Sequence, residues 1–144
     1  MNKTTYEEFL RENGELIYTN VGVSMLPLLR QGKDLFKVKK KGEERCRKYD
    51  VILYRRPPSS YVLHRIVKVL PDGYVVLGDN CLNKEYGIKD ADIIGVMTSF
   101  VRKGKEHSTK ETGYLLYSRF WYAIYPVRRF VMKLKAKTRK LIKK

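Results

Sequence analysis

The sequence has few of the residues that make covalent or metal cross-links. Its 144 residues include only two cysteines, Cys46 and Cys81, which are too few for a disulfide framework. Neither cysteine has a second cysteine or a histidine at the spacing of zinc ligands, so we expect no metal site and no cofactor. The scarcity of cysteine also favours a reducing, intracellular location.

Long apolar segments are missing as well. The N-terminus has no charged region followed by an apolar signal segment, and no run of 18 or more apolar residues occurs. We therefore expect neither a signal peptide nor a transmembrane span. The length suits one domain with a single core, and no internal repeat is visible.

Acidic residues are scarce in the last third of the chain. The net charge is +16, but residues 1–101 hold 17 Lys/Arg against 13 Asp/Glu, or +4, whereas residues 102–144 hold 14 against 2, or +12. The basic character therefore belongs to the C-terminal part, and it favours an acidic partner or surface.

A short helix is predicted at the N-terminus. Thr4 can cap it, Glu7 completes a capping-box pattern, and Phe9 and Leu10 are the expected buried contacts. Gly14 ends this helix, which gives a first segment of residues 1–14.

The region from residue 15 to residue 104 has the pattern of a β domain. Short segments rich in Val, Ile and Tyr alternate with turn residues, and Pro71-Asp72-Gly73 predicts a hairpin between two of them. We predict a mainly β fold here. The segments are ELIYTNV, DLFKVKK, YDVILYRR, SYVLHRIVKVL, GYVVLGDN and ADIIGVMTSFVRK.

Residues 105–144 are predicted to form an amphipathic, basic tail. From Leu116 to Leu134 apolar residues recur every three or four positions, as on one helical face, and Pro126 is expected to kink this helix. The Lys/Arg-rich end is expected to be frayed helix or a disordered arm.

A lone serine in VGVSMLPLL is the first candidate for chemistry. A strand would favour a branched apolar residue at position 24, and a helix capped by Ser24 would not continue into Pro27. We interpret the serine as placed for its hydroxyl. Gly22 would leave room for a substrate close to the backbone, and Met25 and Leu26 are the predicted lining of a shallow pocket.

A serine nucleophile needs a base, and the chain has two histidines. His107 lies among polar residues, where a solvated surface histidine is expected. His64 lies in the strand pattern YVLHRIVKV, where alternation places it on one face with Val62 and Ile66. The alternative is a histidine packed in a barrel wall without a catalytic role.

Two acidic residues follow the histidine. A neutral imidazole needs an acceptor on its second nitrogen, and Asp79 in the sequence GDN is the nearer candidate, with Glu85 as the second. GDN is also a common turn sequence, so a plain turn is the alternative.

The ordered set of these motifs resembles the signal peptidase and LexA-like serine peptidases. The motifs are GVSMLP, YDVILYRR, HRIVKV, GDN and DIIGVM, and the resemblance covers roughly residues 15–102. His64 followed by Arg65 is similar to the subgroup with a histidine base, which includes the signal peptidases of the endoplasmic reticulum. In that subgroup an aspartate is usual at the second acidic position, where this chain has Glu85.

The resemblance implies a LexA/signal peptidase-type β fold and a serine endopeptidase. Ser24 would attack the peptide carbonyl, His64 would accept its proton, and Asp79 or Glu85 would hold the ring. The backbone N–H of Ser24 is the expected oxyanion donor. Cleavage after small residues is implied as well.

Cleavage of another chain is favoured over self-cleavage. LexA-type relatives cut a linker that follows a DNA-binding domain, whereas 23 residues precede Ser24 here and contain no pair of small residues such as Ala-Gly. We therefore expect a peptide or protein substrate in trans.

The basic tail has two candidate partners. In residues 114–144 Tyr, Trp and Phe suit the headgroup region and Lys and Arg suit anionic lipid, so we predict peripheral contact with the cytoplasmic membrane. The alternative class is a non-catalytic regulatory or nucleic-acid-binding module on a LexA-like fold, which we favour less. Packing of the helix on the sheet, with a solvated basic end, is compatible with either.

Overall fold

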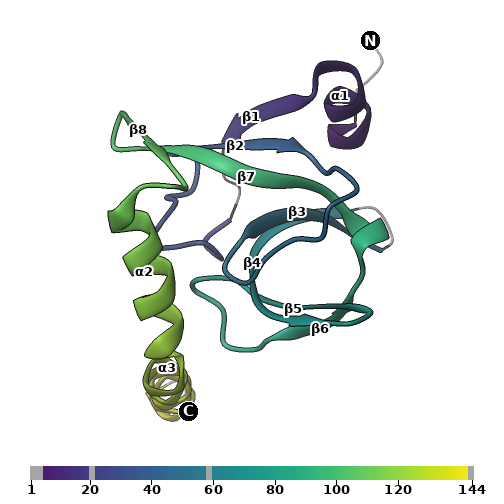
Figure 1. Cartoon of the computed structure of the whole chain (residues 1–144). Helices are drawn as coiled ribbons and strands as arrows, with labels where there is room; N and C mark the ends of the chain where they lie inside the picture. The colour runs from purple at the N-terminus through teal and green to yellow at the C-terminus, as the bar shows by residue number, and fades with distance from the viewer. Residues whose placement is uncertain (1–4, 20–21, 58–59, 143–144) are drawn as a thin grey trace.

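The computed structural model describes residues 5–19, 22–57 and 60–142 of the chain (Figure 1). Within these residues the fold is mainly β, as predicted, with one short N-terminal helix and two C-terminal helices. The strands are β1 (Glu15–Thr19), β2 (Leu35–Lys40), β3 (Val51–Arg56), β4 (Ser60–Leu70), β5 (Gly73–Leu77), β6 (Glu85–Ile88), β7 (Ile93–Arg102) and β8 (Lys105–Ser108).

The strands form one sheet that curls on itself. Their order is β1-β2-β7-β3-β4-β5-β6, with β8 paired to β7, and every pair is antiparallel. In Figure 1, β1, β2 and β7 form the upper wall and β5 and β6 the lower wall, with β3 and β4 between them. The central β3–β4 pair carries His64, which pairs with Ile52 and is 7% exposed.

Strand β4 follows the predicted alternation up to a bulge. Val62 and Ile66 pack with one apolar cluster and Leu63 with another, as expected for opposite faces. The register then shifts between Ile66 and Lys68 against β5. The predicted hairpin is confirmed, because Leu70 pairs with Gly73 across the Pro71-Asp72 connection.

The N-terminal helix α1 (Tyr6–Asn13) begins one residue later than the capping pattern suggested. Thr5 caps it and Glu8 completes the capping box, while Thr4 lies outside the described residues. Leu10 is buried as predicted, but Phe9 is 39% exposed because it lies on the outer face of the helix. Gly14 ends the helix in the left-handed conformation (φ 78°) that glycine tolerates.

The C-terminal part differs from the predicted single kinked helix. Helix α2 (Thr112–Ala123) ends at Ile124, and α3 (Tyr125–Ile142) begins with Pro126 in its first turn. Proline lacks an N–H and disfavours helical backbone in the residue before it, so the chain breaks into two helices there. The basic end, expected to be frayed helix or a disordered arm, is helical through Ile142.

The segment after residue 104 begins with a strand, whereas residues 105–144 were predicted to form a helical tail. Strand β8 forms a hairpin with β7, and His107 stacks on Phe100 with ring centroids 5.3 Å apart. His107 also lies 3.2 Å from a carboxylate oxygen of Glu111. The expected solvated histidine is therefore half-buried, because pairing with β7 brings it against that aromatic ring.

In the part of the chain described, no helix has the length and apolar character required to cross a bilayer.

Candidate active site

Ser24 and His64 line the same pocket, although 40 positions separate them in the chain. The pocket has a volume of about 410 Å³ and is bounded by β1, β2, β3, β4 and the loop after β5. Cys81 and Glu85 line it as well. Further walls are aromatic and come from Tyr6, Tyr18, Phe36 and Tyr61.

The loop that carries Ser24 is fixed by a buried apolar residue on each side of a turn. Met25 and Leu29 are fully buried, and the Leu29 N–H donates to the Met25 carbonyl at 3.0 Å. Gly22 has φ 83°, a conformation that glycine adopts without strain. Ser24 itself stays half-buried at the pocket.

A second loop holds the serine from the other side. The Asn80 backbone N–H donates to the Ser24 carbonyl oxygen at 2.8 Å, and the Asn80 side chain donates to the Val23 carbonyl at 3.1 Å. GDN is a turn, as the alternative interpretation had it, since the Cys81 N–H donates to the Gly78 carbonyl at 2.9 Å. The same turn also positions Ser24, through the hydrogen bonds of Asn80.

The imidazole of His64 has a polar neighbour at each nitrogen. Its Nδ1 lies 3.2 Å from the Tyr54 hydroxyl, and its Nε2 lies 3.8 Å from Cys81 Sγ. The ring is 7% exposed. Burial, with the charge of Arg56 in second place, lowers the pKa of His64 to about 4, so the ring is neutral near pH 7.

The hydrogen bonds around Tyr54 determine the tautomer of this neutral ring. The Tyr54 hydroxyl donates its only proton to Glu85 Oε1 at 2.7 Å. Its oxygen can then only accept from His64, so Nδ1 carries the proton of the imidazole. Nε2 is left as the basic nitrogen, on the side of Cys81.

Glu85 therefore reaches the imidazole through a phenol. Its carboxylate accepts from the Arg56 guanidinium at 2.8 and 3.1 Å, and it lies 29% exposed at the pocket. The Arg56 charge keeps a negative carboxylate in place behind Tyr54. Of the two predicted acidic partners, Glu85 is the one that the hydrogen bonds connect to His64.

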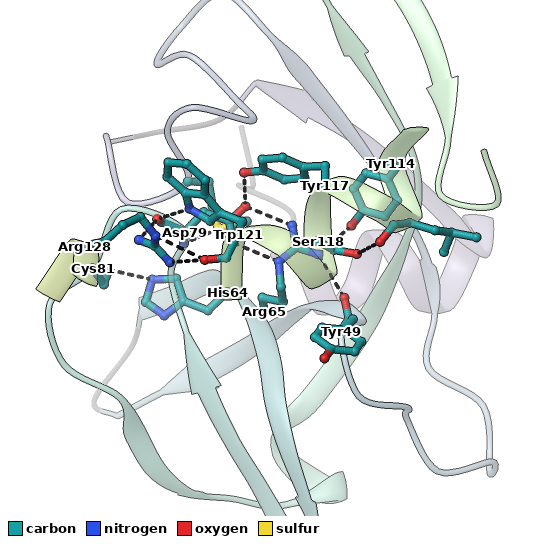
Figure 2. Close-up of polar contacts among 12 residues, drawn as sticks. Tyr49, His64, Arg65, Asp79, Cys81, Tyr114, Tyr117, Ser118, Trp121 and Arg128 are labelled. Carbon is teal, nitrogen blue, oxygen red and sulfur yellow. Dashed lines mark hydrogen bonds and ion pairs between the residues drawn. The ribbon is translucent and has the colours of Figure 1, made fainter. Parts of the chain in front are cut away.

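Asp79 has a different set of partners, shown in Figure 2. Its oxygens accept from Arg65 at 2.8 and 2.9 Å and from the Tyr117 hydroxyl at 2.7 Å. Arg65 follows His64 in β4, so alternation directs it to the opposite face, and Asp79 lies on that face with it. Of the two acids predicted to hold the ring, Asp79 instead forms a buried ion pair with Arg65, with both side chains 2% exposed.

Helices α2 and α3 support the turn that contains Asp79. Trp121 Nε1 and Arg128 both donate to the Asp79 carbonyl, at 2.7 and 3.0 Å (Figure 2). The Tyr125 hydroxyl donates to the Leu82 carbonyl at 2.5 Å. The C-terminal segment is thus packed on the β domain at its first helix and at the root of its second.

None of the residues predicted to line the substrate pocket, Gly22, Met25 and Leu26, is among those that line the described pocket of Ser24 and His64. Met25 is fully buried in the core, where its side chain fills the space under the serine loop, and Leu26 is half-buried beside it. The described pocket is lined instead by the aromatic residues already named. Tyr6 of α1 packs edge-on against Tyr18 at 5.3 Å and against Tyr61 at 5.2 Å.

Three residues of the site were missed from sequence: Tyr54, Arg56 and Cys81. The signal for Tyr54 lies in the register, because Ile52 pairs with His64 and places Tyr54 diagonally beside the histidine. Cys81 directly follows GDN, so a turn there brings its thiol back toward β4. Across the described residues, no group of three or more His, Cys, Asp and Glu side chains is arranged to hold a metal ion.

Comparison of the chain with protein families, with curated proteins and with solved structures found no match.

Proposed function

We propose that the protein is a serine endopeptidase of the signal peptidase and LexA-like type, which cleaves a peptide or protein substrate in trans. The observation that carries the proposal is the shared pocket of Ser24 and His64, with the basic Nε2 of a neutral imidazole beside Cys81, another residue of the pocket lining.

In the proposed reaction every proton transfer passes through one nitrogen, His64 Nε2. Ser24 Oγ attacks the carbonyl carbon of the substrate while its proton moves to His64 Nε2. The resulting imidazolium gives that proton to the leaving amine as the peptide C–N bond breaks, which leaves an acyl ester on Ser24. Water then attacks the ester while its proton moves to Nε2, and this proton passes to Ser24 Oγ as the ester C–O bond breaks and the acid product leaves.

The acidic group of this arrangement is Glu85, acting through the Tyr54 hydroxyl. During proton transfer the imidazole becomes positive, and the carboxylate behind Tyr54 stabilises that charge. Arg56 opposes this stabilisation in part, and burial, followed by the Arg56 charge, lowers the pKa of His64 and keeps the resting ring neutral. The backbone N–H of Ser24 is the proposed donor to the oxyanion, and loss of one such donor costs about 3 kcal/mol of barrier in serine peptidases.

Cys81 is a second candidate nucleophile, because its Sγ lies 3.8 Å from Nε2. Burial raises the pKa of this thiol, so it stays protonated near pH 7 and donates weakly to the imidazole. A cysteine hydrolase would need the thiolate. A neighbouring imidazole can activate a serine or a cysteine. The serine is favoured by the motif GVSMLP, which carries the family resemblance, and the two assignments predict opposite results for Ser24→Ala and Cys81→Ala.

The substrate can be identified in cells. We expect cells that carry Ser24→Ala to accumulate one or a few uncut polypeptides that wild-type cells cleave, with small residues before the cut. Cys81→Ala cells should retain cleavage. If wild-type and Ser24→Ala cells contain the same set of N-termini, the proposal is wrong.

A further inference from the structure

Helix α3 leaves the body of the protein after its first turn. Its root is anchored by Tyr125, which is 7% exposed, and by Arg128, which donates to the carbonyls of Trp121 and Asp79. From Arg129 to Leu141, no side-chain hydrogen bond or ion pair reaches another element among the described residues; Thr138 bonds to Leu134 in the helix itself. In Figure 1 the helix is seen along its axis at the foot of α2, at the edge of the molecule.

One face of this helix is apolar and uncovered. Its residues are spaced i, i+3, i+4, i+7 and i+14, so they share a single stripe along the helix. Each is at least 40% exposed. The stripe consists of Val127, Phe130, Val131, Leu134 and Leu141, and we call it the apolar stripe of α3.

The rest of the helix surface is cationic. Helix α3 contains seven Lys and Arg residues and no Asp or Glu. Lys135 and Lys137 flank the stripe, and Arg129, Lys133 and Lys140 lie farther around the helix. A second copy of α3 is a poor occupant for the stripe, since pairing would bring seven positive charges against seven.

The chemistry of the stripe separates lipid from nucleic acid. Nucleic acids are bound by phosphate contacts and by stacking of bases on aromatic rings, whereas the stripe has four aliphatic residues and one phenylalanine. Aliphatic side chains flanked by lysines are typical of helices that lie in the membrane interface, with the apolar side in the acyl chains and the amines at the headgroups.

We propose that α3 lies in the plane of an anionic bilayer and attaches the protein to it through the apolar stripe and the flanking lysines. The root of α3 holds the turn from Asp79 to Leu82, so attachment there brings the pocket close to the membrane surface. The ligand is the anionic lipid surface itself, and the binding does not depend on catalysis.

The test is flotation of the full-length protein with two kinds of vesicle. We expect it to float with vesicles of phosphatidylcholine and phosphatidylglycerol and to stay unbound with phosphatidylcholine alone. The double variant Phe130→Ser and Leu134→Ser should lose flotation, whereas the matched control Ala136→Ser, on the opposite face of α3, should float like wild type. Because all three positions are exposed, circular dichroism and thermal unfolding of the β domain should not change.

The charge contribution is tested separately. Each basic residue near an anionic surface contributes about 1 kcal/mol, so Lys135→Gln and Lys137→Gln together should weaken vesicle binding by about 30-fold. Ser24→Ala should float normally, so failure of the peptidase proposal would leave this result unaffected. Equal binding of the Phe130 and Leu134 double variant, or retention on DNA at moderate salt without vesicle binding, would overturn the proposal.

Discussion

The backbone N–H of Asn80 donates to the carbonyl oxygen of Ser24 at 2.8 Å, so the turn after β5 is bonded to the serine loop. Gly78 lies at the closest point of this junction. A Cβ added there would meet Cys81 Sγ at 2.5 Å, the Ser24 carbonyl oxygen at 2.8 Å and His64 Cδ2 at 2.9 Å. Atoms of the turn, the serine and the histidine therefore surround the Gly78 Cα so closely that only glycine fits there.

Gly78→Ala should separate the serine from the histidine without unfolding the protein. The added methyl group has to displace a backbone oxygen or the imidazole, which costs about 1–3 kcal/mol of stability. A displacement near 1 Å at a reacting centre reduces the rate by about 100-fold. Peptide cleavage and urea unfolding should be measured beside Gly42→Ala, where a Cβ meets nothing within 4 Å. Full activity in Gly78→Ala would contradict the described junction.

Tyr54→Phe tests the link between Glu85 and the histidine. Removal of the hydroxyl leaves the Nδ1 proton without its acceptor, so we expect cleavage to fall by about 10- to 100-fold, with a stability loss of about 1–3 kcal/mol. Tyr74→Phe is the matched control, because that hydroxyl bonds to Asp90 and to the Cys46 N–H away from the pocket. Similar cleavage rates for the two variants would show that Tyr54 does not support His64 in the proposed reaction.

Asp79→Asn should act on stability rather than on proton transfer. It breaks a buried ion pair in which Arg65 keeps its charge, and the loss of one partner of such a pair costs about 3–5 kcal/mol. Thermal unfolding should therefore occur at lower temperature, while the pH dependence of any remaining cleavage stays that of wild type. A stable variant with a changed pH profile would instead assign Asp79 to His64 in the proposed proton transfer.

The lowered pKa of His64 predicts a stability change at mildly acid pH. The folded-state pKa is about 4, against an ordinary value of 6.5 that we take for the unfolded chain. Between these values the unfolded chain binds more protons, so its population grows as pH falls. The contribution of the neutral ring is complete above pH 6.5 and is lost toward pH 4, by up to about 1.4 kcal/mol per pH unit.

Urea unfolding at pH 6.5 and at pH 5 measures this effect. His64→Asn should lack this contribution to the pH dependence, because it has no group that titrates there. In the wild type, kcat/KM should stay level as pH falls from 7 to 5 and should decrease only near pH 4, where the free ring gains its proton. A decrease centred on pH 6.5 would show that the ring is solvated in the active protein.

Much of the sheet could be predicted from sequence because its signals are local. Turn residues and alternation are enough to place the hairpin at Pro71-Asp72 and the two faces of β4 as far as Ile66. The bulge after Ile66 depends on pairing with β5, which leaves no local signal. Pro126 predicts a kink, whereas the structure has two separate helices there. Whether a proline bends or ends a helix depends on what the following residues pack against.

The site was predictable in its residue types and less so in its connections. Ser24 and His64 are polar residues in apolar stretches of sequence, Glu85 is the second acidic residue after the histidine, and all three line one pocket. Asp79 was the nearer acid in the chain, but the strand alternation that separates His64 from Arg65 assigns it to the arginine. The role of Tyr54 follows from strand register, which short-range patterns do not determine.

The most direct test of the account is cleavage of a complex peptide library by the purified protein, with new N-termini identified by mass spectrometry. We expect the wild type and Cys81→Ala to cut the same peptides. Ser24→Ala and His64→Ala should each cut none of them. Cleavage that persists in Ser24→Ala, or that disappears in Cys81→Ala while Ser24→Ala stays active, would contradict the assignment of Ser24 as nucleophile and His64 as base.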